Sequence, residues 1–167
     1  MATLTALEFS TADGAKNMLD TVKQLQKEQL ITIVDAAIVS WPVGKKKPQT
    51  KQLVSLGGVG ALQGAFWGML FGLIFFVPFF GMAVGALIGG LAGHFVDYGI
   101  SDDFIKEVRN QVTEGTSALF LLTQSAVTER VVERLKGQKF EIISTNMTAE
   151  QEAKLREAFS AEEKLPD

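Results

Sequence analysis

The sequence predicts an α+β fold in which two strand–helix–strand halves are separated by a long hydrophobic insertion. In both flanks of the 167-residue chain, runs of strand-forming residues alternate with amphipathic stretches. By contrast, residues 52–96 contain no Asp, Glu, Lys or Arg. The length allows one domain with an inserted element, but it does not comfortably allow two independent globular units.

The first half is predicted to be a strand, a helix and a second strand. Residues 3–9 are rich in strand formers, and Ser10 is the expected N-cap of the helix that follows. Residues 30–40 form a β-branched run that is interrupted by Asp35, and this run predicts the second strand. The helix between them should extend to about residue 29, because its apolar residues share one face: Ala15, Met18, Leu19, Val22 and Leu25.

The second half begins with a helix that should extend to about residue 113. Ser101 is its expected N-cap, and Asp102 and Asp103 lie in the first turn, where the helix dipole favours negative charge. Gly115 should end this segment. Residues 117–125 are almost wholly apolar, which is typical of a strand that is covered on both faces.

Three further elements complete the second half. A short helix is expected at 127–135, with Gly137 closing it, and a last strand at 139–144. Thr148 and Gln151 match a capping box, which predicts a charged tail helix to about residue 164.

Two such halves in one small chain predict a ferredoxin-like split βαβ sheet of four strands with the helices on one face. We therefore divide the chain into four parts. Residues 1–44 and 100–146 are the two halves of the domain, residues 45–99 are a membrane-inserting helical hairpin, and residues 147–167 are a charged C-terminal helix or tail.

Two series of glycines, each with a spacing of four residues, predict that the insertion is a glycine-zipper hairpin. The series mirror each other about the bond between Phe76 and Val77, so antiparallel helices would place glycine opposite glycine. Glycine at every fourth residue leaves a groove along a helix, and this groove allows close backbone contact in lipid. In water, each glycine costs about 1 kcal/mol of helix propensity relative to alanine. The expected packing and oligomer residues are Gly60, Gly64, Gly68, Gly72, Gly81, Gly85, Gly89 and Gly93.

The length and the flanks of the hairpin predict a location in the bacterial inner membrane. Residues 53–76 and 79–96 are each long enough to cross roughly 30 Å of hydrocarbon, with Phe66, Leu70 and Leu73 facing lipid or neighbouring subunits. The membrane flank consists of Lys45, Lys46, Lys47 and Lys51, which would keep both termini in the cytoplasm.

The expected hairpin tip leaves two other arrangements open. Its residues, Phe76, Val77, Pro78 and Phe79, include no polar side chain that would suit a loop in water. The hairpin could therefore be re-entrant, or it could be buried inside a soluble homo-oligomer.

Four segments of the chain resemble a known family. They are residues 30–39 (LITIVDAAIV), 64–68 (GAFWG), 97–106 (DYGISDDFIK) and 117–121 (SALFL). Together they resemble the bacterial domain-of-unknown-function family 1269 of predicted membrane proteins. That family commonly has a proline and a glycine before the last motif, whereas here Glu114 precedes Gly115. The resemblance implies a bacterial membrane protein and no known activity.

The composition argues against several kinds of chemistry. A net charge of −3 disfavours a nucleic-acid partner, and the absence of cysteine removes disulfides and thiolate catalysis. His94, Asp97, Asp102 and Asp103 form the only cluster that resembles a metal site, but first-turn carboxylates explain the last two. We therefore expect no enzyme activity, no metal and no cofactor.

The sequence favours a non-enzymatic membrane protein that self-assembles through its hairpin and has a structural or membrane-organising role. Its expected partners are the lipid bilayer and further copies of itself. A small oligomeric channel, lined by glycine and Gln63, is one alternative. A ligand-sensing module is another, because ferredoxin-like sheets often hold small ligands.

Overall fold

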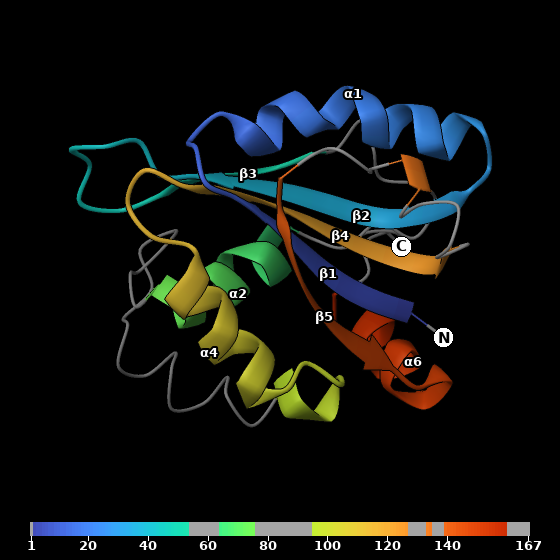
Figure 1. Cartoon of the computed structure of the whole chain (residues 1–167). Helices are drawn as coiled ribbons and strands as arrows, with labels where there is room; N and C mark the ends of the chain where they lie inside the picture. The colour runs from blue at the N-terminus through green and yellow to red at the C-terminus, as the bar shows by residue number, and fades with distance from the viewer. Residues whose placement is uncertain (1, 54–63, 76–94, 127–132, 135–138, 160–167) are drawn as a thin grey trace, which may run out of the picture.

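The described part of the chain is built around one antiparallel sheet of five strands in the order β3-β2-β4-β1-β5 (Figure 1). The computed structural model describes residues 2–53, 64–75, 95–126, 133–134 and 139–159. The strands are β1 (Ala2–Phe9), β2 (Ile31–Ser40), β3 (Gln49–Gln52), β4 (Ser117–Ala126) and β5 (Glu141–Met147). The predicted α+β class is confirmed.

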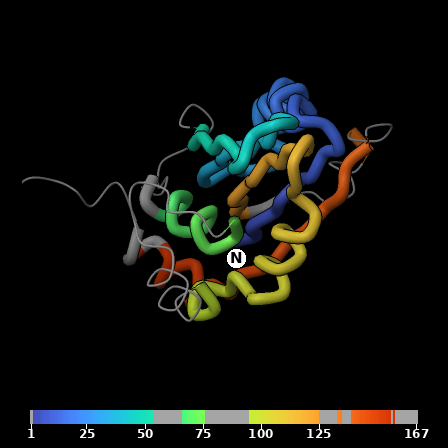
Figure 2. Tube along the Cα trace, turned by 90° about the vertical axis from the view of Figure 1, so that its left-hand side faces the viewer, coloured from blue at the N-terminus to red at the C-terminus, as the bar shows by residue number. Residues whose placement is uncertain are grey.

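Helices cover both faces of this sheet (Figure 2). The first helix, α1 (Gly14–Lys27), packs on one face, and its side chains Met18, Val22 and Leu25 belong to the core on that side. The other face carries α2 (Gly64–Phe75) and α4 (Asp102–Gln111), and α6 (Ala149–Phe159) adjoins β5. The expectation that all helices lie on one face is therefore wrong, because the apolar insertion supplies a helix for the second face.

The strands agree with the predicted ones except near the two edges of the sheet. The last strand, β5, begins and ends later than expected, and its residues Ile143 and Met147 are buried in the core. Strand β3 was not predicted at all. Its sequence, QTKQ, has no apolar residue, and it pairs with β2 alone. A polar edge strand of this kind leaves no hydrophobic pattern in the sequence.

The first helix begins later than Ser10 would suggest. Its N-cap position is occupied by Asp13, whose side chain makes no capping hydrogen bond. Gly14 follows at a point of close approach, because a Cβ atom there would lie 2.4 Å from Cβ of Phe9. The chain needs glycine at this position in order to turn from β1 into α1.

The other two predicted helix starts are confirmed by their hydrogen bonds. Ser101 Oγ accepts from the backbone N–H of Phe104 at 3.2 Å. In the capping box, the Gln151 N–H donates to Thr148 Oγ1 at 3.1 Å, and the Thr148 N–H donates to Gln151 Oε1 at 2.9 Å. Each pair satisfies backbone donors that the first turn of a helix leaves free.

Helix α2 corrects the membrane prediction. It has 12 residues, and the side chains that were expected to face lipid, Phe66, Leu70 and Leu73, are at most 3% exposed within the protein core. No helix among the described residues is both long and apolar enough to cross a bilayer. The predicted transmembrane hairpin and the predicted inner-membrane location with cytoplasmic termini are therefore wrong. A helix that is apolar on all sides is typical of a protein core as well as of a membrane span.

Several predicted features lie outside the described residues. These are the hairpin tip (Phe76, Val77, Pro78 and Phe79), five of the eight glycines (Gly60, Gly81, Gly85, Gly89 and Gly93), and also Gln63, His94 and most of the short helix expected at 127–135.

Candidate functional site

A buried carboxylate, Asp35, joins three elements of the fold. Its side chain is fully buried in β2. One oxygen, Oδ2, accepts from Gln52 Nε2 at 2.9 Å and from Trp67 Nε1 at 3.0 Å, while Oδ1 accepts from the backbone N–H of Ala36 at 2.8 Å. Because Gln52 belongs to β3 and Trp67 to α2, this carboxylate links β2, β3 and α2.

A β-bulge in β2 turns Asp35 toward α2. Ile33 pairs with Thr123 and Asp35 pairs with Leu122, so that Val34 is an extra residue in the ladder. Ile33 lies in the core under α1, whereas Val34 lies in the core that contains α2. In a regular strand without a bulge, Asp35 would point to the same face as Ile33, toward α1.

Aromatic rings surround the indole that donates to Asp35. The Trp67 ring contacts those of Phe66 and Phe71 at centroid distances of 5.0 Å and 5.8 Å, and Phe71 packs edge-on against Phe120 of β4 at 5.1 Å. A carboxylate in such surroundings is costly unless donors satisfy it. Since protein donors occupy both of its oxygens, we assign Asp35 a structural role.

Arg109 of α4 holds the C-terminal end of α2. Its Nε donates to the carbonyl of Ile74 at 2.7 Å, and its Nη2 donates to the carbonyl of Leu73 at 3.1 Å. Carbonyls in the last turn of a helix lack partners within the helix, and the dipole there favours a cation. Partial burial lowers the pKa of the Arg109 guanidinium. Arg109 thereby joins two helices of the core.

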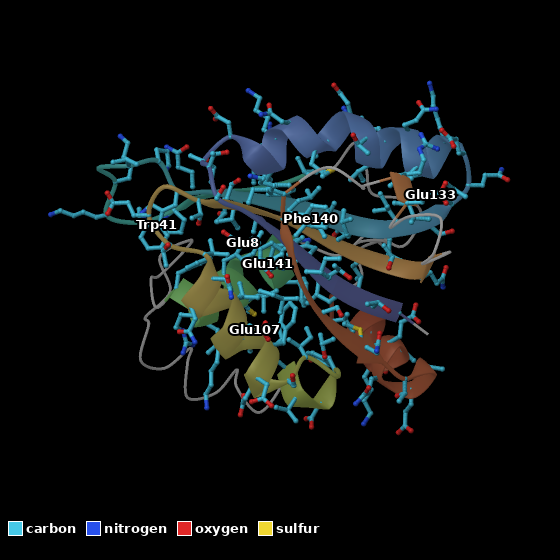
Figure 3. The ribbon with its side chains drawn as sticks, viewed as in Figure 1. Glu8, Trp41, Glu107, Glu133, Phe140 and Glu141 are labelled. Carbon is cyan, nitrogen blue, oxygen red and sulfur yellow. The ribbon has the colours of Figure 1, made fainter. Side chains whose placement is uncertain are left out.

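Two carboxylates face each other across β1 and β5. Glu8 pairs with Glu141 in the register of these strands, and the two residues are labelled next to each other in Figure 3. Glu8 is only 7% exposed. Its burial raises the pKa of the Glu8 carboxyl, and the negative charge of Glu141 raises this pKa further.

An open cavity of about 510 Å³ lies between α1, β2 and β3 on the α1 side of the sheet. Its apolar lining consists of Leu19, Ile38 and Leu53, which are half-buried and pack against the core under α1. The remaining lining residues are polar, charged or small: Ala12, Asp13, Lys16, Ser40, Gln49, Thr50 and Lys51. The volume lies within the range of roughly 300 to 1,000 Å³ that is usual for small-molecule pockets.

The predicted site residues are distributed over several parts of the fold. Gly64, Gly68 and Gly72 lie in α2, where Gly68 and Gly72 are buried. Lys45, Lys46 and Lys47 are exposed in the loop between β2 and β3, and Lys51 is exposed in β3, where it lines the cavity. Within the described ranges, no group of three or more acidic or histidine side chains is arranged to hold a metal ion.

Sequence reasoning missed both the Asp35 contacts and the cavity. A single charged residue in a β-branched run was a usable signal, because a buried carboxylate requires donors, and the nearest indole in the apolar segment is Trp67. The cavity left no such signal, because one of its walls comes from the unpredicted strand β3.

Comparisons with known proteins identify the family but no characterised relative. No curated protein and no solved structure matches the chain. One family model matches residues 61–160, which include α2, α4, β4, β5 and α6. This match covers more than half of the chain, and the chain therefore belongs to the family described as "Protein of unknown function (DUF1269)".

Proposed function

We propose that this protein is a non-enzymatic ligand-binding module with a ferredoxin-like core, and that its ligand occupies the cavity between α1 and β3. The observation that carries the proposal is the cavity itself. Its floor is apolar (Leu19, Ile38 and Leu53), and its rim consists of the polar and charged lining residues. Specific small-molecule sites commonly combine an apolar lining with a few polar groups in this way.

The strand order supports the ferredoxin-like part of the proposal. Strands β1 and β2 are connected by α1, and β4 lies between them and is antiparallel to both. Strand β5 pairs with the other side of β1. The order β2-β4-β1-β5 agrees with the one expected for a split βαβ sheet, and β3 extends the sheet at the β2 edge.

A fragment titration of the full ¹⁵N-labelled chain tests the ligand-binding proposal. We expect small amphipathic fragments to shift the amide signals of residues that line the cavity, such as Ile38, Thr50 and Leu53. An Ile38→Trp variant should lose these shifts, because the larger side chain fills the cavity, and Thr50→Trp is a second variant at the edge strand. The matched control is Ile142→Trp on β5, where Ile142 is 52% exposed and lies outside the cavity lining. If no fragment shifts the cavity residues in the wild-type chain, the proposal is wrong.

We also propose that the glycine series allows close helix packing within the chain. The supporting observation is that Gly68 and Gly72, four residues apart on α2, are both buried. Gly68→Leu should then lower the free energy of unfolding in urea titrations, whereas Met69→Leu at the half-buried neighbouring position should change it little. Equal free energies of unfolding in the two variants would refute this packing role.

A further inference from the structure

We infer that the ligand of the cavity is a small amphipathic anion, an inference that rests on the proposed ligand-binding function. The first argument is the apolar floor. Leu19 comes from α1, Ile38 comes from β2, and Leu53 directly follows β3, so three segments of the chain contribute to the floor. A ligand that covers these side chains gains about 25 cal/mol for each Å² of apolar surface removed from water. The ligand should therefore carry a short apolar body.

The charged residues that line the cavity determine the sign of the charge at the other end of the ligand. Lys16 extends from α1 and Lys51 from β3, so ammonium groups come from both walls of the cavity. Asp13 is the one carboxylate among the lining residues. Two positive charges and one negative charge leave the lining with a net charge of +1. The ion pairs of the described residues involve neither lysine.

The loop between β2 and β3 carries further positive charge, and the residues at its two ends line the cavity. Residues 41–48 connect Ser40 with Gln49, and both of these residues line the cavity. The loop carries the exposed residues Lys45, Lys46 and Lys47, and Figure 1 shows it projecting at the end of the molecule where α1 begins.

Hydrogen bonds fix this loop. Trp41 Nε1 donates to the carbonyl of Lys45 at 2.9 Å, and the Gly44 N–H donates to Glu114 Oε2 at 2.6 Å. Glu114 is the acidic side chain that contacts the loop, and it faces a backbone donor there. A cluster of like charges around a cavity raises the local concentration of oppositely charged ligands.

The rim also argues against a cationic ligand. A cation would have to approach Lys16 and Lys51 with only the Asp13 carboxylate as a counter-charge. The hydroxyl of Ser40 is already engaged, because it donates to the carbonyl of Ala12 at 2.8 Å. An anionic head group with an apolar body of a few carbons satisfies both parts of the lining.

Three probes of equal chain length separate the possible ligand classes. Hexanoate, hexanol and hexylamine are titrated into the full ¹⁵N-labelled chain, and Kd is read from the amide signals of the cavity residues. We expect hexanoate to bind most tightly and hexylamine most weakly. A fourth probe, hexyl phosphate, shows whether the anion is preferred as a carboxylate or as a phosphate ester.

Lysine variants test the source of this preference. Lys16→Gln and Lys51→Gln should each weaken hexanoate binding about two- to fivefold, as expected for one exposed charge pair, and should leave hexanol binding unchanged. Lys23→Gln, at an exposed position of α1 that does not line the cavity, is the matched control and should change neither. If hexanol or hexylamine binds as tightly as hexanoate, the anion inference is wrong while the ligand-binding function stands. If no probe shifts the cavity residues, the proposed function itself is wrong.

Discussion

At the scale of single residues, the hydrogen-bond donors to Asp35 determine how much its buried charge lowers the free energy of unfolding. Trp67→Phe removes the indole N–H that donates to Asp35 Oδ2 at 3.0 Å and keeps most of the aromatic surface. A buried carboxylate that loses a donor typically costs about 1–3 kcal/mol. We expect the free energy of unfolding to fall by about this amount in urea titrations that are followed by far-UV circular dichroism.

The other tryptophan provides the matched control. Trp41 Nε1 also donates a hydrogen bond, but its acceptor is the carbonyl of the exposed residue Lys45. Water can replace that bond, so Trp41→Phe should reduce stability by less than about 1 kcal/mol. Equal losses in the two variants would show that the Asp35 contact contributes nothing beyond ring packing.

Ionisation of Glu8 makes the stability of the protein depend on pH. Because the folded state raises the pKa of Glu8 above 4.5, the folded chain holds this proton more tightly than the unfolded chain. The contribution of Glu8 to stability is therefore fully present below about pH 4.5, and it is lost as the pH rises through the folded-state pKa.

Glu8→Gln should accordingly stabilise the protein at pH 7 by about 0.5–1 kcal/mol, because it removes a buried charge that lies opposite Glu141. At pH 3.5 the variant and the wild-type chain should have nearly the same free energy of unfolding. Glu150→Gln is the control, since Glu150 is exposed on α6. A gain at pH 3.5 as large as the gain at pH 7 would contradict the assignment to Glu8 ionisation.

At the scale of elements, the sequence predicted those whose signal is local. The stripe of Ala15, Met18, Val22 and Leu25 is visible in the sequence and is buried in α1. Strand β4 was predicted from its continuous apolar run, and both of its faces are covered. In each of these elements, the residues that become buried can be identified from a short stretch of the sequence.

The wrongly predicted elements depend on contacts between distant parts of the chain. The charge-free sequence of α2 fits a bilayer as well as a core, and what distinguishes the two is its length and its partners, Asp35 and Arg109. Strand β3 has no apolar residue and forms through its pairing with β2. The cavity between α1 and β3 therefore could not be foreseen.

At the scale of the whole molecule, the bulge at Val34 turns Asp35 toward the face of the sheet that α2 occupies. With α1 on the other face, the sheet is covered on both sides. The prediction of a sheet with helices on one face assigned the insertion to lipid and to further copies of the chain, and not to the second face of the sheet. A single extra residue in a strand is difficult to recognise in a sequence, because it alters the alternation at only one step.

The same sheet order predicts a gradient of hydrogen exchange across the molecule. Strand β4 pairs with β2 on one side and with β1 on the other, whereas β3 has four residues and pairs with β2 alone. The amides of Leu119, Phe120 and Leu121 should therefore exchange only through global unfolding, and that of Lys51 at least about 100-fold faster through local opening. Native-state hydrogen exchange at increasing urea concentration measures both, because global opening depends strongly on urea and local opening hardly at all. Equal protection at Lys51 and Phe120 would mean that β3 unfolds only together with the sheet, and the wall of the cavity would then be as stable as the core.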